Sequence, residues 1–177
     1  MKLIIFILLK ICRINYESLP VIKGIPLIKN KGVIKLGKCV TLISGIIYNP
    51  VGGNKTIISV NKNAKLTIGH KTGISNSIIY CRKEISIGCD VYIGANVHIY
   101  DTDFHSIDIK SRLTEGDQGI SKKITIEDGV FIGAHSIILK GSHIGKNCVI
   151  GAGSVVTGKL DNDSVYAGNP IKLIKKL

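Results

Sequence analysis

The sequence predicts an all-β fold, a parallel β-helix in which short strands wind around a narrow aliphatic core. Aliphatic residues recur every six positions, at Ile87, Ile93 and Ile99 and again from Ile126 to Val156. A second sign is the repeated phrase aliphatic, polar, aliphatic, then Gly or an acid, as in Ile85–Gly88. A six-residue period does not match the helical repeat of about 3.6 residues, and three such units close a coil of about 18 residues.

The composition agrees with this fold. The chain of 177 residues fits one domain, and 20 Gly with no Trp indicate small aliphatic side chains stacked on each other. The net charge of +12 favours a solvated Lys-rich surface over a nucleic-acid partner, because the lysines are scattered and few aromatics accompany them. The five cysteines form no C-x-x-C pair, so we expect no disulfide frame, no zinc site and a cytoplasmic location.

The first element is an N-terminal cap and entry segment over residues 1–33. The apolar run Leu3–Leu9 ends at Lys10 and is too short to cross a membrane. It predicts a short helix that either caps the first repeat, the favoured interpretation, or lies peripherally on the inner membrane face. Residues 12–33 contain two prolines and indicate an irregular lead-in.

The β-helix is predicted over residues 34–166, followed by a basic C-terminal tail over 167–177. In each six-residue unit the aliphatic first position points into the core, and a small second residue lets the backbone turn. About six coils of about 18 residues fit this span. The general preference for right-handed crossovers would give a right-handed coil, but the spacing itself does not determine the handedness.

One corner carries a long insertion. The phrase at Ile87 should recur at 87 + 18 = 105 but recurs at Ile126, so 126 − 105 = 21 residues are inserted. We expect an excursion loop over 105–125. A further single extra residue is expected near 81–84, because Ile68 and Ile87 are 19 positions apart.

Several motifs point to one family. They are Ile93–His98 leading into Asp103-Phe104-His105, then Gly129–His135, Ile150–Thr157 and Ala167–Pro170. Over about residues 60–177 the chain resembles the hexapeptide-repeat acyltransferases, within them the sugar O-acetyltransferases of the galactoside and maltose acetyltransferase type and those of surface-polysaccharide assembly. The resemblance implies a left-handed parallel β-helix, acetyl-CoA as co-substrate, and a homotrimer with active sites between subunits.

The resemblance also assigns residues. It implies His105 as catalytic base and Asn76 as an acceptor-binding residue. The acetyl-CoA site it implies consists of small residues at two turns and polar residues that meet the phosphates: Gly133, Ala134, Gly151, Ala152, Thr157, Lys159 and Lys172. Two departures are Gly158, which separates Val-Thr from the usual lysine, and Phe131 in place of the usual Trp.

Acyl transfer to a hydroxyl needs a base whose pKa lies near the working pH, which histidine provides. We expect His105 to take the acceptor proton during direct transfer, with a backbone N–H near Gly133 on the oxyanion. Asp103 or a backbone carbonyl would fix the imidazole tautomer. Asp101, Asp103 and Arg112 are further candidates for acceptor contact, although Arg112 has the alternative of pairing with Asp108 or Glu115.

The sequence therefore predicts an acetyl-CoA-dependent O-acetyltransferase that acts on a saccharide without a metal. The same site leaves open N-acetylation of an amino sugar, or acetylation of serine or of an antibiotic hydroxyl. From another class, a non-catalytic solenoid that serves in binding or assembly stays open. A zinc site of His98, His135 and His143 is disfavoured, because the zinc enzymes with this solenoid pair two histidines five apart, whereas 143 − 135 = 8.

Overall fold

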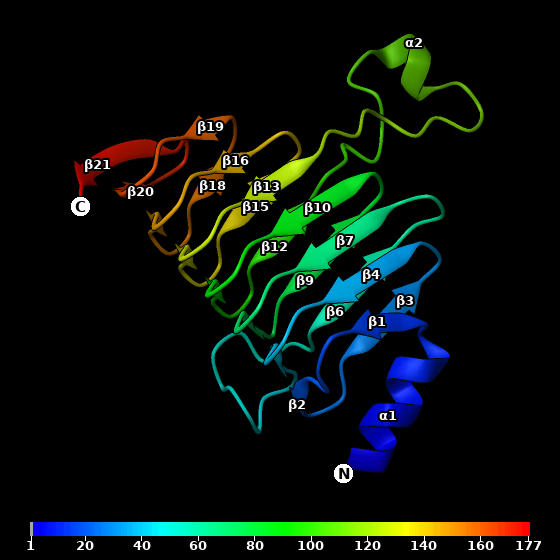
Figure 1. Cartoon of the computed structure of the whole chain (residues 1–177). Coiled ribbons are helices and arrows are strands. Elements are labelled where there is room, and N and C mark those ends of the chain that lie inside the picture. The colour runs from blue at the N-terminus through cyan, green and yellow to red at the C-terminus, as the bar shows by residue number, and fades with distance from the viewer. Residues whose placement is uncertain (1) are drawn as a thin grey trace.

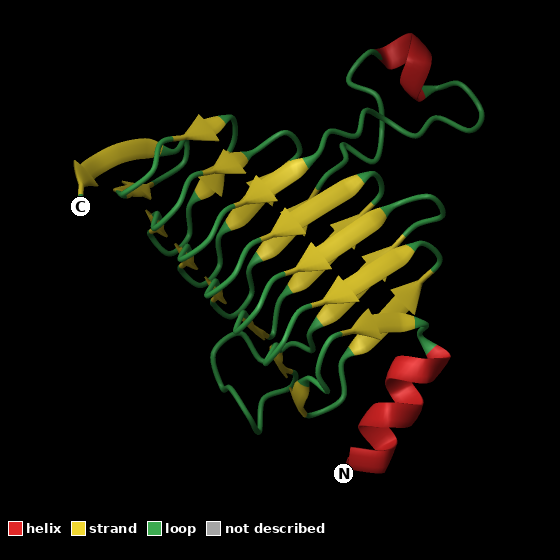
Figure 2. Ribbon diagram, viewed as in Figure 1, coloured by secondary structure: helices red, strands yellow, loops and turns green. Residues whose placement is uncertain are grey.

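The computed structural model describes residues 2–177 and shows a triangular solenoid with the two termini at opposite ends (Figure 1). Three sheets run along the stack, and successive coils pair in parallel (Figure 2). Sheet A contains β1 (Ile14–Tyr16), β4 (Val33–Leu36), β7 (Lys65–Ile68), β10 (Glu84–Ile87), β13 (Ile124–Ile126), β16 (His143–Ile144) and β19 (Lys159–Leu160). Sheet B contains β2 (Val21–Lys23), β5 (Thr41–Ile43), β8 (Gly73–Ser75), β11 (Tyr92–Ile93), β14 (Phe131–Ile132), β17 (Val149–Ile150), β20 (Ser164–Ala167) and β21 (Lys172–Lys176). Sheet C contains β3 (Leu27–Asn30), β6 (Ile57–Val60), β9 (Ile78–Cys81), β12 (His98–Tyr100), β15 (Ile137–Leu139) and β18 (Val155–Val156).

The core is the predicted aliphatic column. Ile87, Ile93 and Ile99 are each at most 3% exposed, and Val91 and Val97 at the fifth positions are fully buried. Strand residues alternate between core and surface, which is the geometry of a pleated strand. The period-six interpretation is therefore confirmed.

The β-helix starts earlier than predicted. β1, β2 and β3 pair in register with β4, β5 and β6, so residues 14–30 form a complete first coil. The expected irregular segment and the boundary at residue 34 were wrong. Pro20 and Pro26 misled because each stands just before a strand, where a missing N–H costs no ladder hydrogen bond.

The helix α1 (Lys2–Ile11) caps the first coil, as the favoured interpretation stated. Leu9 is fully buried, and Leu8 and Ile5 pack against the core. No helix within residues 2–177 is long and apolar enough to cross a membrane. At the other end, the three lysines of the basic tail lie in β21, which pairs antiparallel with β20.

The inserted loop projects away from the stack and carries the short helix α2 (Ile109–Arg112) (Figure 1). Ile85 pairs with Ile124, and 124 − 85 = 39 equals 18 + 21, so the predicted length of the insertion is confirmed. The loop occupies residues 101–123 rather than 105–125, because the chain leaves sheet C directly after β12. A bridge between Thr102 and Ser121 closes its base.

Candidate active site

His105 stands at the start of the excursion loop, anchored by its aromatic neighbour. The Phe104 ring lies 4.8 Å from that of Tyr80 and 5.6 Å from that of Tyr100, both on the outer face of sheet C. The His105 backbone N–H donates to the Asp103 carbonyl at 2.8 Å. Its side chain remains 71% exposed. The imidazole is thus held at a fixed point of the backbone and is open to a substrate.

Asp117, which the sequence interpretation missed, lies beside this imidazole. Its Oδ2 is 3.5 Å from His105 Nδ1, and its side chain is 8% exposed. Hydrogen bonds from the Ser106 hydroxyl and the Ser106 and Gly119 N–H groups, together with nearby His105, lower the pKa of Asp117 to about 2. An ionised carboxylate at Nδ1 favours the proton there and leaves Nε2 to act as a base.

Asp103 does not take the orienting role expected of it. Its Oδ2 lies 3.1 Å from Lys140 Nζ, on the neighbouring coil. The hydrogen bond between Asp103 and His105 involves their backbones and not the Asp103 carboxylate. The residue that can fix the tautomer is therefore Asp117, from the returning arm of the loop, which no spacing in the sequence indicates.

Asp101 is fully buried and caps a corner. Its carboxylate accepts hydrogen bonds from the backbone N–H groups of Arg82, Lys83 and Glu84 at 2.7, 2.7 and 2.8 Å. Burial, then the charge of Asp101, raises the pKa of Cys81 to about 12, so the thiol stays protonated and lies 3.7 Å from Asp101 Oδ2. This corner connects β9 to β10. Lys65 pairs with Glu84, and 84 − 65 = 19, so this coil is one residue longer than 18, as predicted.

Asn76 is also fully buried, and its amide is used within the chain. Its Oδ1 accepts from the Gly45 N–H at 2.8 Å, and its Nδ2 donates to the Asn49 carbonyl at 2.8 Å and to the Val51 carbonyl at 3.3 Å. The residue thereby fastens the loop between β5 and β6. In this structure Asn76 and Asp101 hold corners, and neither directs a free polar group outward.

Arg112 closes the excursion loop on itself. Its Nη1 donates to the carbonyls of Ser106 and Ile107 at 3.2 and 3.1 Å. Neither expected carboxylate partner is used, since Asp108 instead caps α2 by accepting from the Ser111 N–H at 2.8 Å.

The residues expected to bind acetyl-CoA fall into two groups. Gly133 and Ala134, with Gly151 and Ala152 on the next coil, occupy the corner between sheets B and C. A Cβ on Gly133 would lie 2.6 Å from the Ala152 nitrogen, so glycine is required there. Lys172 pairs with Ala167 near this corner. The second group, Thr157 and Lys159, lies at the opposite edge of sheet C, where the chain passes to sheet A.

The amides at the first corner correct one expectation. The Gly133 N–H donates to the Ile150 carbonyl at 2.8 Å, so it is not free for an oxyanion. Within residues 2–177 the Ala134 and Ala152 N–H groups have no such acceptor and are available to a bound molecule.

The three histidines of the zinc alternative lie on different elements. His143 is in sheet A, with Nε2 2.7 Å from Glu127 Oε1. His98 is in sheet C, and His135 lies at the corner between sheets B and C, 3.4 Å from the Asn96 amide. Burial, then the nearby His135, lowers the pKa of His98 and favours its neutral form.

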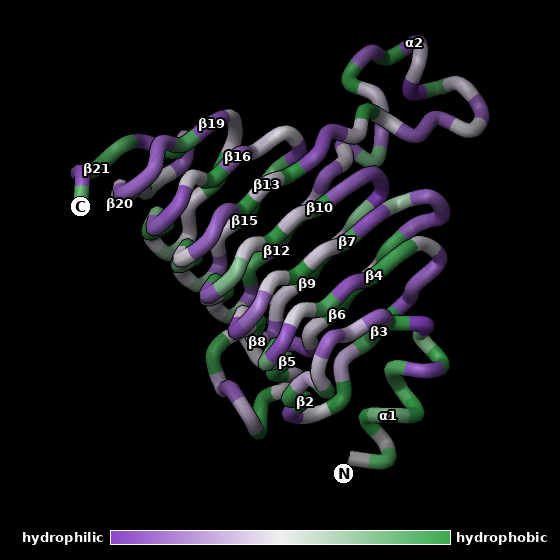
Figure 3. Tube along the Cα trace, in the orientation of Figure 1, coloured by the Kyte–Doolittle hydropathy of each residue, from purple (hydrophilic) through white to green (hydrophobic). Residues whose placement is uncertain are grey.

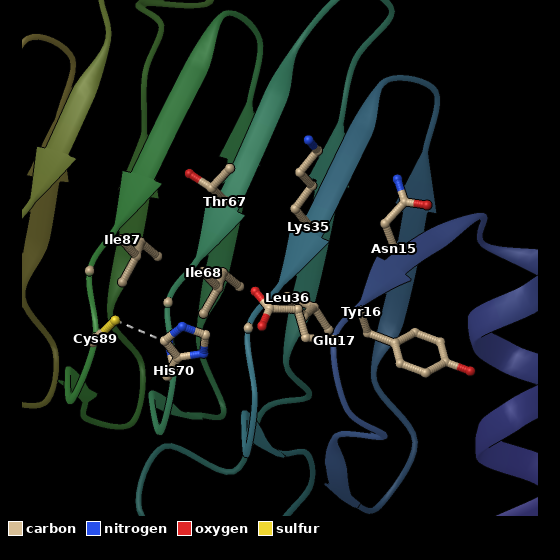
Figure 4. A pocket seen from close by; sticks show the side chains of 13 residues that line it. Asn15, Tyr16, Glu17, Lys35, Leu36, Thr67, Ile68, His70, Ile87 and Cys89 are labelled. Atoms are coloured by element: carbon tan, nitrogen blue, oxygen red, sulfur yellow. Dashed lines mark hydrogen bonds between the residues drawn. The ribbon is translucent and has the colours of Figure 1, made fainter.

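A groove of about 730 Å³ crosses the outer face of sheet A and contains none of the expected site residues (Figure 4). Its wall includes Lys35, Thr67, His70 and Cys89. His70 Nδ1 accepts the Lys38 N–H at 2.9 Å, which gives this imidazole a structural role.

Residues 123–158 match the family model described as bacterial transferase hexapeptide (six repeats). The chain thus carries the hexapeptide repeat of bacterial transferases in this segment. Its fold is accordingly the left-handed parallel β-helix that the resemblance implied.

Relatives of this hexapeptide-repeat protein are acetyltransferases by name, and some are named for a galactoside or for lipopolysaccharide. It is 42% identical over 96 residues to a galactoside O-acetyltransferase of Lactococcus lactis, covering 53% of this chain and 44% of that protein. It is 29% identical over 170 residues to the putative lipopolysaccharide biosynthesis O-acetyl transferase WbbJ of Escherichia coli, covering 93% and 82%. A hexapeptide-repeat acetyltransferase of Vibrio cholerae solved with acetyl-CoA matches with a TM-score of 0.61 and 32% identity, covering 68% and 63%. The chain spans about half the length of three of the curated relatives it matches.

Proposed function

We propose that this hexapeptide-repeat protein is an acetyl-CoA-dependent O-acetyltransferase that acts on a saccharide hydroxyl. The observation that carries the proposal is the exposed His105 at the root of the excursion loop, with the ionised Asp117 at its Nδ1. Two further observations support it. The Ala134 and Ala152 N–H groups are free, and the coils resemble those of an acetyltransferase solved with acetyl-CoA. The test is thiol release from acetyl-CoA with a panel of saccharides, followed by mass spectrometry of the products. An absence of acetylated product with every acceptor would contradict it.

The proposed step is a direct transfer. His105 Nε2 takes the proton of the acceptor hydroxyl as its oxygen attacks the thioester carbonyl. The C–S bond then breaks, and the imidazolium returns the proton to the leaving thiolate. Asp117 stabilises the imidazolium, and a corner N–H such as that of Ala134 binds the oxyanion. Product analysis separates an ester, as proposed, from the amide that an amino-sugar acceptor would give.

We further propose that the site forms between two copies of the chain in a trimer. His105 and the corner at Ala134 lie at opposite edges of sheet C, whose strands of about three residues separate them by about 10 Å. Apolar side chains lie on the outer faces of both sheets: in sheet B Tyr92 is 62% exposed and Phe131 48%, and in sheet C Ile137 and Leu139 are half-buried. A second copy that covers these faces would bury this surface and bring the two halves of a site together.

The trimer predicts a mass in solution three times the 19.1 kDa of one chain. Replacing both Tyr92 and Phe131 with Asp should give a monomer that has lost transfer activity, because charges would be buried at the interface. Light scattering and the thiol assay measure both properties. A fully active monomer would rule out the shared site.

The N-terminal helix supports a peripheral membrane contact. Beyond the side that caps the coil, α1 exposes Leu3, Phe6, Ile7 and Ile11 at 70, 49, 46 and 74%. Figure 3 shows the apolar character of this helix. A short helix with an apolar face beside basic residues such as Lys10 and Arg13 suits an anionic bilayer surface.

We expect the chain to sediment with vesicles of anionic phospholipid, and the variant Phe6→Glu/Ile7→Glu to stay in the supernatant. Both residues are exposed, so the fold should be retained. Lys110→Glu, on the excursion loop, serves as a charge control and should sediment like the unmodified chain. Equal sedimentation of the α1 variant would exclude the contact.

A further inference from the structure

A pocket of about 340 Å³ lies where the chain passes from sheet C to sheet A in the first three coils. We name it the basic corner pocket; its polar lining includes Lys29, Lys31, Lys62, Arg82 and Gln118. The four cations come from the ends of β3, β6 and β9, which are adjacent in sheet C. Neighbouring strands lie about 4.8 Å apart, so the positive charges are stacked within reach of one small ligand.

The pocket has no internal counter-charge. Within residues 2–177 none of its four cations forms an ion pair. The carboxylate of Asp101, which contacts the Arg82 backbone, is buried and already accepts three N–H groups. Stacked like charges repel one another unless an anion joins them. The pocket therefore has the electrostatics of an anion site.

The Arg82 side chain is positioned by the excursion loop. Its Nη1 donates to the Gln118 carbonyl at 2.6 Å, which holds the guanidinium at the rim of the pocket and leaves other donors unused. The preceding residue in the chain, Asp117, is the carboxylate at His105. One peptide unit of the loop thus connects the basic corner pocket to the proposed catalytic base.

We propose that the basic corner pocket binds a phosphate group carried by the acceptor, so that the substrate is a phosphorylated saccharide. This rests on the proposed function. Three lysines and one arginine exceed what a single carboxylate needs, whereas a phosphate or diphosphate carries about two charges and several acceptor oxygens. A phosphate held at Arg82 would leave the sugar hydroxyls on the side of the loop where Asp117 and His105 stand. A soluble sugar phosphate and a lipid-linked sugar diphosphate share this chemistry.

Binding can be tested without turnover. Pyrophosphate is titrated calorimetrically with CoA present at saturation, so that the CoA phosphate contacts are occupied. We expect binding that weakens with salt and falls at least tenfold in Lys31→Gln/Lys62→Gln, two exposed residues whose loss should not affect folding. The matched control Lys38→Gln/Lys71→Gln removes the same charge from another corner and should bind within twofold of the unmodified chain. No binding by the unmodified chain, or equal losses in both variants, would overturn the proposal.

The second readout is acceptor choice. In the thiol assay, kcat/KM for glucose 1-phosphate should exceed that for methyl glucoside about tenfold or more, and this ratio should approach one in Lys31→Gln/Lys62→Gln. The control Lys38→Gln/Lys71→Gln should keep the ratio of the unmodified chain. A ratio near one in the unmodified chain would overturn the phosphate assignment. Farnesyl diphosphate-linked glucose, used as a third acceptor, separates the lipid-linked source from the soluble one. If no acceptor is acetylated but pyrophosphate binding is lost in the pocket variant alone, the proposed function fails while the anion site stands.

Discussion

Replacing His105 with Ala is expected to lower kcat for acetyl transfer by about 10²- to 10⁴-fold, the usual contribution of a positioned general base. The side chain is 71% exposed and packs in no core, so stability should be unchanged. Binding of acetyl-CoA should also be kept, because the corners at Ala134 and Ala152 lie across sheet C. The loss would therefore be confined to the chemical step.

Two neighbouring carboxylates make the matched comparison. Asp117→Asn should lower kcat at least tenfold, since the amide no longer favours the proton on Nδ1. Asp103→Asn removes the negative charge that pairs with Lys140 and does not change the groups around the imidazole. It should lower kcat by less than threefold. Single-turnover thiol release on the three variants measures the step directly. Equal rates for His105→Ala and the unmodified chain would remove the base assignment, and a larger loss at Asp103 than at Asp117 would reverse the choice of orienting residue.

The Asp101→Asn variant is expected to lose about 3–5 kcal/mol of unfolding free energy. Asn presents one acceptor oxygen in place of two, so at least one of the three buried N–H groups at Arg82, Lys83 and Glu84 is left unsatisfied and the charge-assisted bonds are lost. Urea unfolding followed by circular dichroism should show a lower midpoint.

Asp90→Asn is the control, because Asp90 is exposed at another corner and has the left-handed φ of 54° that Asn tolerates. Its change should stay within about 0.5 kcal/mol. Well below its unfolding temperature, Asp101→Asn should keep most of its transfer activity, in accord with a structural role. A variant that is fully stable yet inactive would instead return Asp101 to the acceptor site.

Much of the fold could be predicted because the coils of a β-helix impose a regular spacing of aliphatic residues on the sequence. Each inward aliphatic residue must recur when the chain returns to the same sheet, so Ile87, Ile93 and Ile99 reveal the coil, and a failure of phase reveals the length of the insertion. The first coil escaped this reading because Pro20 and Pro26 at its corners resemble breaks in sequence. Only their place just before β2 and β3 shows that they are compatible with pairing.

The sequence by itself thus determined the solenoid, the register of the coils it identified, the 21-residue insertion and the place of His105 in it. Only the tertiary structure decided which groups serve that histidine. Asp117 lies beside His105 because the excursion loop folds back, and Asp103 pairs with Lys140 instead. Such partners depend on the path of the loop in space, which spacing in the sequence does not give. Burial decided the rest. Asn76 and Asp101 are buried polar residues at corners. They form hydrogen bonds with backbone groups that those corners leave unpaired.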